Sequence, residues 1–327
     1  MAKPPGRASL SILSYWKRPT PALVTLGFVA MALVPLRGNP ELTSYFLTML
    51  DVMLITFSLN MVVGFIGYLD FGHVVFWGLG SYTAGLAVSA LGKPLTFGAY
   101  FFVPLGGLVA AAFAVLVGYP ALRIRGAYFA IASFSINLAV QTIFFNVDAF
   151  GGSQGLPLLR YVSYQVVTAY YWELGFTFLA FVASYVILNR KLGYGLLAIR
   201  NDEDMAKSLA INTTAYKIGI YAIGAFFAGV AGAIWGLAQV FVDPDNFGIG
   251  RSIEMFVTMM LGGVGTASGP FIGAFIFYGL KDLLVLRFPH LHLVIFGVVI
   301  MVIVLFLPGG LVGTLRERLP RLRRILE

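Results

Sequence analysis

The 327-residue sequence contains no cysteine and only three histidines, at positions 73, 290 and 292. A disulfide framework and cysteine-based metal sites are therefore excluded, and we expect neither a metal site nor a cofactor. The nucleotide-binding pattern G-x-x-x-x-G-K-[ST] and the hydrolase patterns H-E-x-x-H and G-x-S-x-G are also absent. These absences predict that the chain has no catalytic residues and is not an enzyme.

Charge is scarce as well. Only 11% of the residues are charged, whereas soluble domains carry about a quarter. The hydrophobic share is 59% and the mean hydropathy is +0.88, so much of the outer surface must face membrane lipid. The composition predicts an all-α, multi-pass bundle in a cell membrane.

The basic residues are clustered, which argues against a nucleic-acid partner despite the net charge of +8. Sixteen of the 22 lie in four short stretches: four in 1–19, two in 119–126, five in 189–217 and five in 309–327. Such clustering marks cytoplasmic segments. We expect cytoplasmic tails at 1–19 and 309–327, a transmembrane domain at 20–308 and a cytoplasmic loop at 189–217.

Membrane-spanning helices need about 20 mostly apolar residues. Candidate segments are 20–36, 42–69, 71–92, 98–119, 126–147, 167–188, 218–242, 252–280 and 291–308. The first has no clear small-residue cleavage site after it, which favours a retained helix over a signal peptide. Because some of these nine candidates contain breaks, we expect about eight to ten membrane segments.

Topology sets the number of crossings. A cytoplasmic N-terminus places residue 70 inside and residues 243–251 outside, and the basic tail is cytoplasmic only if 252–280 crosses an even number of times. That segment contains Gly262-Gly263-Val264-Gly265-Thr266-Ala267-Ser268-Gly269-Pro270, where glycine and proline favour a helix break. A second glycine-rich break lies at Gly64–His73.

Open backbone at membrane depth is tolerated only beside protein or a water-filled cavity, so both breaks are candidates for the transport path. Paired breaks also indicate inverted repeats, although glycines used only for close helix packing would give the same pattern. Candidate path residues are Gly67, Asp70, Gly72, His73, Asn137, Gln141, Gly262, Gly263, Gly265 and Thr266.

Polar residues inside the segments are few. Asp51 has no evident basic partner within the membrane, and Asp70 and Glu254 lie near segment ends where water could reach them. Asn137 and Gln141, four residues apart, share one helix face and could either line a polar path or join two helices.

The loop at 189–217 contains a short charged helix. Asn201 or Asp202 can cap it, acids occupy its first turn, and Met205 and Leu209 lie on one face. This pattern favours docking on a partner protein, and the three consecutive acids argue against the alternative, a helix lying on an anionic membrane surface. The expected docking residues are Arg200, Asn201, Asp202, Glu203, Asp204, Met205, Ala206, Leu209 and Ile211.

Five ordered motifs resemble those of branched-chain amino-acid ABC transporter permeases. They lie in 67–83, 122–132 with the following 151–156, 198–212, 261–270 and 307–311, so the resemblance covers roughly 45–315. The first motif departs from the family at Leu69-Asp70-Phe71-Gly72-His73, where a polar residue and Ser-Leu-Gly-His are frequent.

The resemblance implies an inner-membrane permease for branched-chain amino acids or similar small amino-acid or amide solutes. It also implies a heterodimer with a second homologous permease, two ATPase subunits docked on the 198–212 loop and a periplasmic or extracellular solute-binding protein. The alternatives are an ion-coupled secondary transporter, which would need more buried ionisable groups than are evident here, and a channel.

Overall fold

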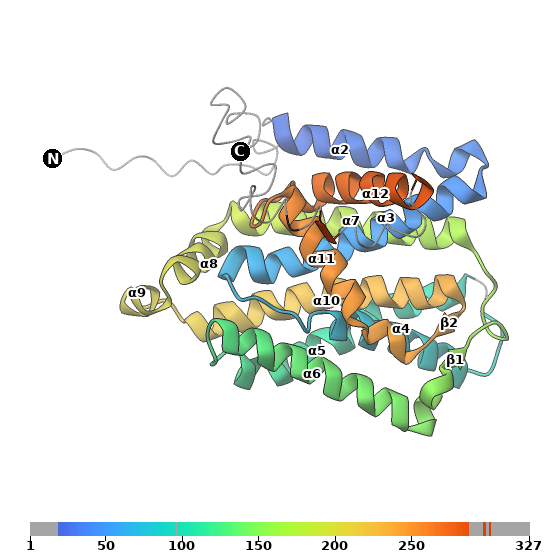
Figure 1. Ribbon diagram of the computed structural model, residues 1–327, viewed down its shortest axis with the longest axis horizontal. Helices are drawn as coiled ribbons and strands as arrows, with labels where there is room; N and C mark the ends of the chain where they lie inside the picture. Colours follow the sequence, from blue (N-terminus) through green and yellow to red (C-terminus); the bar gives the residue numbers. More distant parts are fainter. Residues whose placement is uncertain (1–18, 96, 288–296, 299–300, 302–327) are drawn as a thin grey trace.

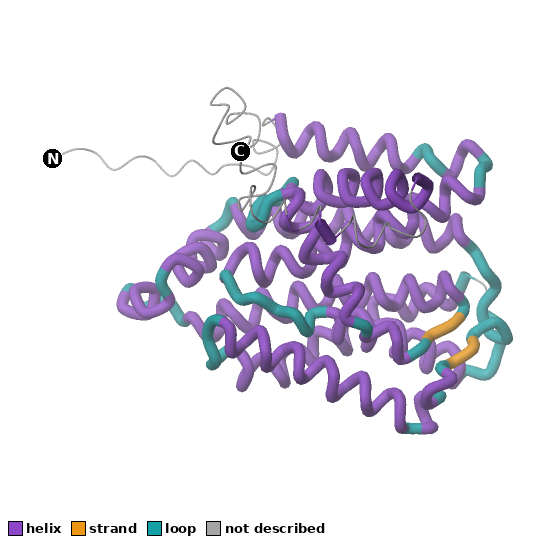
Figure 2. Tube along the Cα trace, in the orientation of Figure 1, coloured by secondary structure: helices purple, strands orange, loops and turns teal. Residues whose placement is uncertain are grey.

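The computed structural model describes residues 19–95, 97–287, 297–298 and 301 (Figure 1). Helices dominate and the strands are two residues each (Figure 2), which confirms the all-α prediction. The α-helices are α2 (Pro19–Ala32), α3 (Pro40–Leu59), α4 (Val74–Ala90), α5 (Val103–Ala121), α6 (Ala127–Asn146), α7 (Val166–Leu188), α8 (Lys191–Asn201), α9 (Glu203–Ser208), α10 (Thr213–Gln239), α11 (Ile249–Gly262) and α12 (Gly269–Arg287). The shorter elements are the 3-10 helices η1 (Pro35–Arg37), η3 (Gly98–Phe102), η4 (Asp148–Phe150), η5 (Gly152–Gln154) and η6 (Pro244–Phe247), the π-helix η2 (Asn60–Gly64), and strands β1 (Leu156–Pro157) and β2 (Phe241–Val242).

Among the described residues, five helical stretches are long and apolar enough to cross a membrane: Pro40–Gly64, Gly98–Ala121, Ala127–Asn146, Val166–Leu188 and Thr213–Gln239. At one end of the bundle α8 and α9 project beyond these spans, and at the other end β1 and β2 pair antiparallel (Figure 1). We call these the α9 end and the strand end.

Helices α3 and α10 form the centre and run antiparallel. The Ser58 hydroxyl donates to the Gly224 carbonyl at 2.5 Å, while Asp51 and Trp235 both meet Arg251 nearer the strand end. Glycine permits close packing of α10 against α4. A Cβ at Gly232 of α10 would collide with the Trp77 carbonyl of α4, whereas one at Gly219 would meet nothing within 4 Å.

Two breaks between α-helices lead into the interior from opposite ends of the bundle. Residues 67–73 run from the α9 end to the start of α4, and residues 240–248 run from the strand end to the start of α11. In both places a long helix is followed by a break and then by a shorter helix, and the two runs point in opposite directions, which is the pattern of an inverted repeat. The break that corresponds to 67–73 is 240–248, and not the Gly262–Pro270 break.

Two predictions about residues at segment ends need correction. Asp70 is fully buried, where its carboxylate accepts a hydrogen bond from the Gly72 amide and contacts His73, so it is not open to water as predicted. Residues 243–251 are not a simple outer loop either. Phe247 is fully buried, stacks on Tyr82 and packs against Phe144.

The break within 252–280 is confirmed. Helix α11 ends at Gly262 and α12 begins at Gly269, and the two pack against each other, as an even number of passes requires. The segment expected at 218–242 begins earlier, at Thr213, so Lys217 belongs to α10 and not to the preceding loop. The segment 291–308 and both predicted tails lie almost wholly outside the described residues.

Candidate transport and coupling sites

A buried polar chain holds the inner end of segment 67–73. His73 contacts Asp70 Oδ2 through Nδ1 at 2.9 Å and Ser58 Oγ through Nε2 at 2.6 Å. The Ser58 hydroxyl also donates to the Gly224 carbonyl, so Ser58 links His73 to α10.

This chain has the residue types of a hydrolase triad but cannot work as one. A catalytic serine must give its proton to the histidine and reach a substrate. Ser58, Asp70 and His73 are all fully buried, and the serine proton points elsewhere. The residues instead tie the extended segment to α3 and α10.

The second break, residues 240–248, is held by α6. Asn137 Nδ2 donates to the Phe247 carbonyl at 2.9 Å and Gln141 Nε2 donates to the Pro244 carbonyl at 3.2 Å. These amides join α6 to the break, because they satisfy backbone carbonyls that it exposes, and a role of the two residues in lining a polar path stays a prediction.

An ionic network at mid-bundle was not expected from the sequence. Arg251 Nη1 lies 3.2 Å from Asp51 Oδ2 and 3.3 Å from Glu254 Oε2, and Lys281 lies 2.6 Å from Glu254. The prediction that Asp51 lacks a basic partner is therefore wrong. Glu254 is also only 21% exposed, so it is not a freely hydrated residue at a span end.

Two tryptophans complete this network. The Arg251 guanidinium lies 4.9 Å from the Trp77 ring and 4.6 Å from the Trp235 ring, and Trp77 Nε1 donates to Asp51 Oδ1. Arg251 thereby joins α11 to α3, α4 and α10. The sequence offers a weak signal, since these are two of only four tryptophans and both lie in apolar segments.

The two glycine-rich breaks predicted from the sequence meet at the α9 end. Asn60 donates to the Thr266 carbonyl at 3.0 Å and accepts from the Gly265 amide at 2.7 Å. The Arg200 side chain donates to the Gly64 carbonyl at 2.5 Å and also lies against Gly67. Gly262 and Gly263 end α11 beside this junction, so α8 contacts both breaks through Arg200.

Helix α9 presents the predicted apolar pair to solvent. Asp202 caps it by accepting from the amides of Asp204 and Met205, whereas Asn201 ends the preceding helix. Met205 is 65% and Leu209 69% exposed, while Ala206 is buried beneath them. Ile211 is half-buried just after the helix.

Glu203 fixes α9 to the bundle. Its carboxylate accepts from Tyr68 at 2.7 Å and from Lys217 at 3.0 Å, and Lys207 lies 3.2 Å away. Burial alone would raise the pKa of Glu203, but these hydrogen bonds and the Lys217 charge lower it to about 2. A bidentate contact from Arg125 likewise lowers the pKa of Asp204 to about 2.

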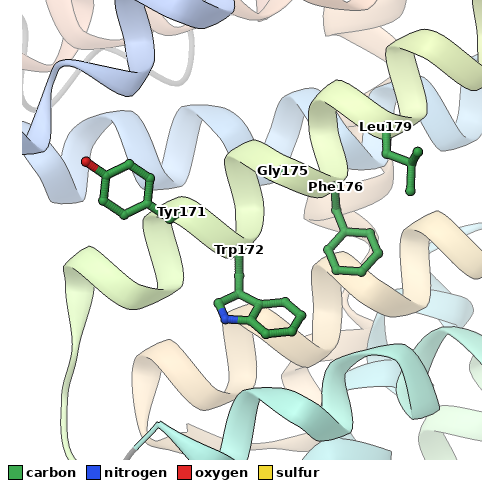
Figure 3. A pocket seen from close by; sticks show the side chains of 5 residues that line it. All are labelled: Tyr171, Trp172, Gly175, Phe176 and Leu179. Atoms are coloured by element: carbon green, nitrogen blue, oxygen red, sulfur yellow. The ribbon is translucent and has the colours of Figure 1, made fainter.

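A shallow apolar hollow on α7 lies away from these contacts. It measures about 300 Å³ and is lined by Tyr171, Trp172, Gly175, Phe176 and Leu179 (Figure 3). All five residues come from the outer stripe of one helix, and no charged group converges on it. The hollow suits lipid chains and not a polar solute. Among the described residues no cluster of metal-ligating side chains occurs.

Comparison with known proteins identifies the family. The family model "branched-chain amino acid transport system / permease component" matches residues 42–304. The high-affinity branched-chain amino acid transport system permease protein LivM of Salmonella typhimurium is 28% identical over 321 residues, covering 89% of this chain and 74% of that protein. The permease protein LivH of Escherichia coli is 26% identical over 287 residues (80% and 90%), and BraD of Pseudomonas aeruginosa is 28% identical over 285 (80% and 91%). No solved structure matches the chain. Since the family model covers most of its length, the chain belongs to the permease family of branched-chain amino acid transport systems.

Proposed function

We propose that this chain is a membrane permease subunit of an ATP-driven importer for branched-chain amino acids or similar small amino-acid or amide solutes. The observation that carries the proposal is the family match over 42–304, within which α9 and both backbone breaks lie. Relatives named as permeases of branched-chain amino acid transport support this solute class over the ion-coupled alternative.

ATP hydrolysis would take place on two separate ATPase subunits that dock on α9. An exposed apolar pair on a short charged helix is the form in which an amphipathic helix enters a groove of a partner. Two contacts would transmit a movement of α9 to the interior of the bundle. Glu203 holds Tyr68 at the start of segment 67–73, and Arg200 holds Gly64 beside Gly265.

A second homologous permease would cover the outer face of α11. Asp51 lies about 17 Å along its 25-residue span at 1.5 Å per residue, near the centre of a hydrocarbon core of about 30 Å. Arg251 beside it is 18% exposed, Glu254 21% and Lys281 41%. Partly exposed charges at this depth face protein or water and not lipid.

The extended segment beside α11 supports the same assignment. Leu69 and Phe71 are 45% and 40% exposed, and within the described part of the chain their amides donate no hydrogen bond. Lipid cannot satisfy such groups. The solute path would therefore run between this face and the second permease, with a solute-binding protein delivering solute at the strand end.

The proposed orientation places the α9 end, and both chain termini, in the cytoplasm of a cell whose inner or plasma membrane holds the protein. The basic clusters support it. Because the chain has no cysteine, single cysteines at Ser208 and Ser153 can be labelled in sealed vesicles. We expect a membrane-impermeant reagent to reach them from opposite sides, and labelling of both from one side would contradict the orientation.

The decisive test is Met205→Asp in the reconstituted complex. A charge in a desolvated contact costs on the order of a few kcal/mol, so solute-stimulated ATP hydrolysis should collapse while the chain still inserts. Thr142→Asn, on an exposed face of α6, serves as a control that leaves hydrolysis unchanged. Normal ATP hydrolysis and transport by Met205→Asp would contradict the docking assignment.

A further inference from the structure

A small polar pocket lies at the α9 end, where α5 ends and α10 begins. Its volume is about 150 Å³, and four basic side chains line it with one acid: Arg123, Arg125, Lys207, Lys217 and Glu203. The transport proposal gives this pocket no role beyond holding α9.

The charges in and around the pocket do not balance. Arg125, Lys207 and Lys217 share two carboxylates, those of Glu203 and Asp204. Arg123 has no carboxylate partner among the described residues and lies 4.6 Å from the Tyr119 ring. Four cations against two carboxylates leave a net charge of +2 (4 − 2), so the pocket favours an anion.

The position of the pocket indicates which kind of anion it can bind. Helix α5 ends at Ala121 and α10 begins at Thr213, so the pocket is level with the ends of membrane spans, where lipid headgroups lie. On α5, Leu116 just before the pocket and Tyr119 in its lining are 72% and 53% exposed and continue the apolar outer surface. A charged headgroup and its acyl chains can therefore be accommodated together.

We propose that this pocket binds the phosphate of an anionic phospholipid, with an acyl chain along α5 at Leu116. The inference goes beyond the transport function and requires only that the helices span a membrane. Basic pockets between membrane helices recognise such headgroups. A phosphate here would offset the excess positive charge around Glu203 and so strengthen the attachment of α9, which makes coupling sensitive to lipid composition.

The test is native mass spectrometry of the full-length chain in detergent, titrated with phosphatidylglycerol or phosphatidylcholine. We expect preferential binding of phosphatidylglycerol and about fivefold weaker binding for Arg123→Gln, the effect of removing one basic contact. Arg190→Gln changes the net charge equally but lies outside the pocket and should bind like the wild type. Thr214→Asp, which adds a negative charge at an exposed lining position, should weaken binding as well if Arg123→Gln fails to fold.

Three results would overturn the proposal. Equal binding by the Arg123→Gln and Arg190→Gln variants would show general attraction to the basic end of the protein. Complete displacement of phosphatidylglycerol by millimolar inorganic phosphate would indicate a free-phosphate site. Loss of the bound lipid when the ATPase subunits assemble would assign the pocket to an acidic surface of that partner. None of these results bears on which solute is transported.

Discussion

At the residue scale, Arg251 shows what can and cannot be predicted from sequence. Its pairing with Asp51 joins residues 200 positions apart, and it forms only because α11 begins at mid-bundle beside α3. No local pattern encodes that contact. The Asp202 cap, in contrast, satisfies amides two and three residues away and could be predicted from its immediate neighbours.

Replacing Arg251 should be costly. Arg251→Gln leaves Asp51 and Glu254 without their shared cation inside the bundle, and we expect the free energy of unfolding to fall by about 3 to 5 kcal/mol. Adding Asp51→Asn should recover part of the loss, because one unpaired charge is then removed. Unfolding in mixed detergent micelles, arranged as a double-mutant cycle, measures both effects.

The control for this experiment is Arg160→Gln. Arg160 is exposed in the loop after β1 and makes no ion pair among the described residues. We expect a change within about 0.5 kcal/mol. A similarly small loss for Arg251→Gln would mean that neither the ion pairs nor the tryptophan contacts of Arg251 hold α11 in place.

At the element scale, hydropathy located the helices but not the extended segments. Residues 67–73 contain Asp70 and His73, and residues 240–248 contain Asp243 and Asp245, so their polarity indicates breaks in the spans but not that the backbone turns back into the bundle. Hydrogen bonds between residues far apart in the sequence hold these segments in place: His73 contacts Ser58, and Asn137 contacts the Phe247 carbonyl. The glycine-rich breaks were predictable because glycine and proline act locally on the backbone.

The attachment of α9 should depend on pH. The pKa of Glu203 is lowered from 4.5 to about 2, so its ion pairs stabilise the docked helix fully above about pH 4.5. That contribution is lost progressively as the pH falls from 4.5 through 2. Hydrogen exchange of the α9 amides, corrected for intrinsic rates, should therefore show falling protection over this window.

Glu203→Gln provides the matched control. This variant lacks the Glu203 carboxylate at every pH, so the protection of α9 should be lower at pH 7, and its smaller fall at low pH should come from Asp204 alone, whose pKa is also lowered to about 2. If the two proteins lost protection in parallel, the contact of Arg125 with Asp204 would be the main attachment instead.

At the scale of the whole molecule, composition was enough to predict the all-α class and the order of the motifs to predict the family. Neither predicts which outer face of the bundle meets lipid and which meets protein. Leu108 on α5 and Ile253 on α11 are similarly exposed in the isolated chain, at 59% and 48%. The neighbours of Leu108 are apolar side chains on a regular helix. Ile253 adjoins Glu254 and the open backbone at Phe71.

We therefore expect the two positions to differ in the assembled complex. A fluorophore on a single cysteine at Leu108 should be quenched strongly by brominated phospholipid in proteoliposomes, because lipid covers α5. The same fluorophore at Ile253 should be shielded, because the second permease covers α11 and lipid cannot satisfy its charged and unpaired neighbours.

Comparing the isolated chain with the assembled complex tests whether the second permease covers α11. When this chain is reconstituted alone, the Ile253 fluorophore should become accessible to water-soluble iodide, while the Leu108 fluorophore should not. Equal lipid quenching at both positions in the complex would place α11 against lipid and remove the proposed interface. Shielding of Ile253 even in the isolated chain would mean that another part of the same chain covers α11. If the second permease failed to co-purify at all, the proposed subunit composition itself would be wrong.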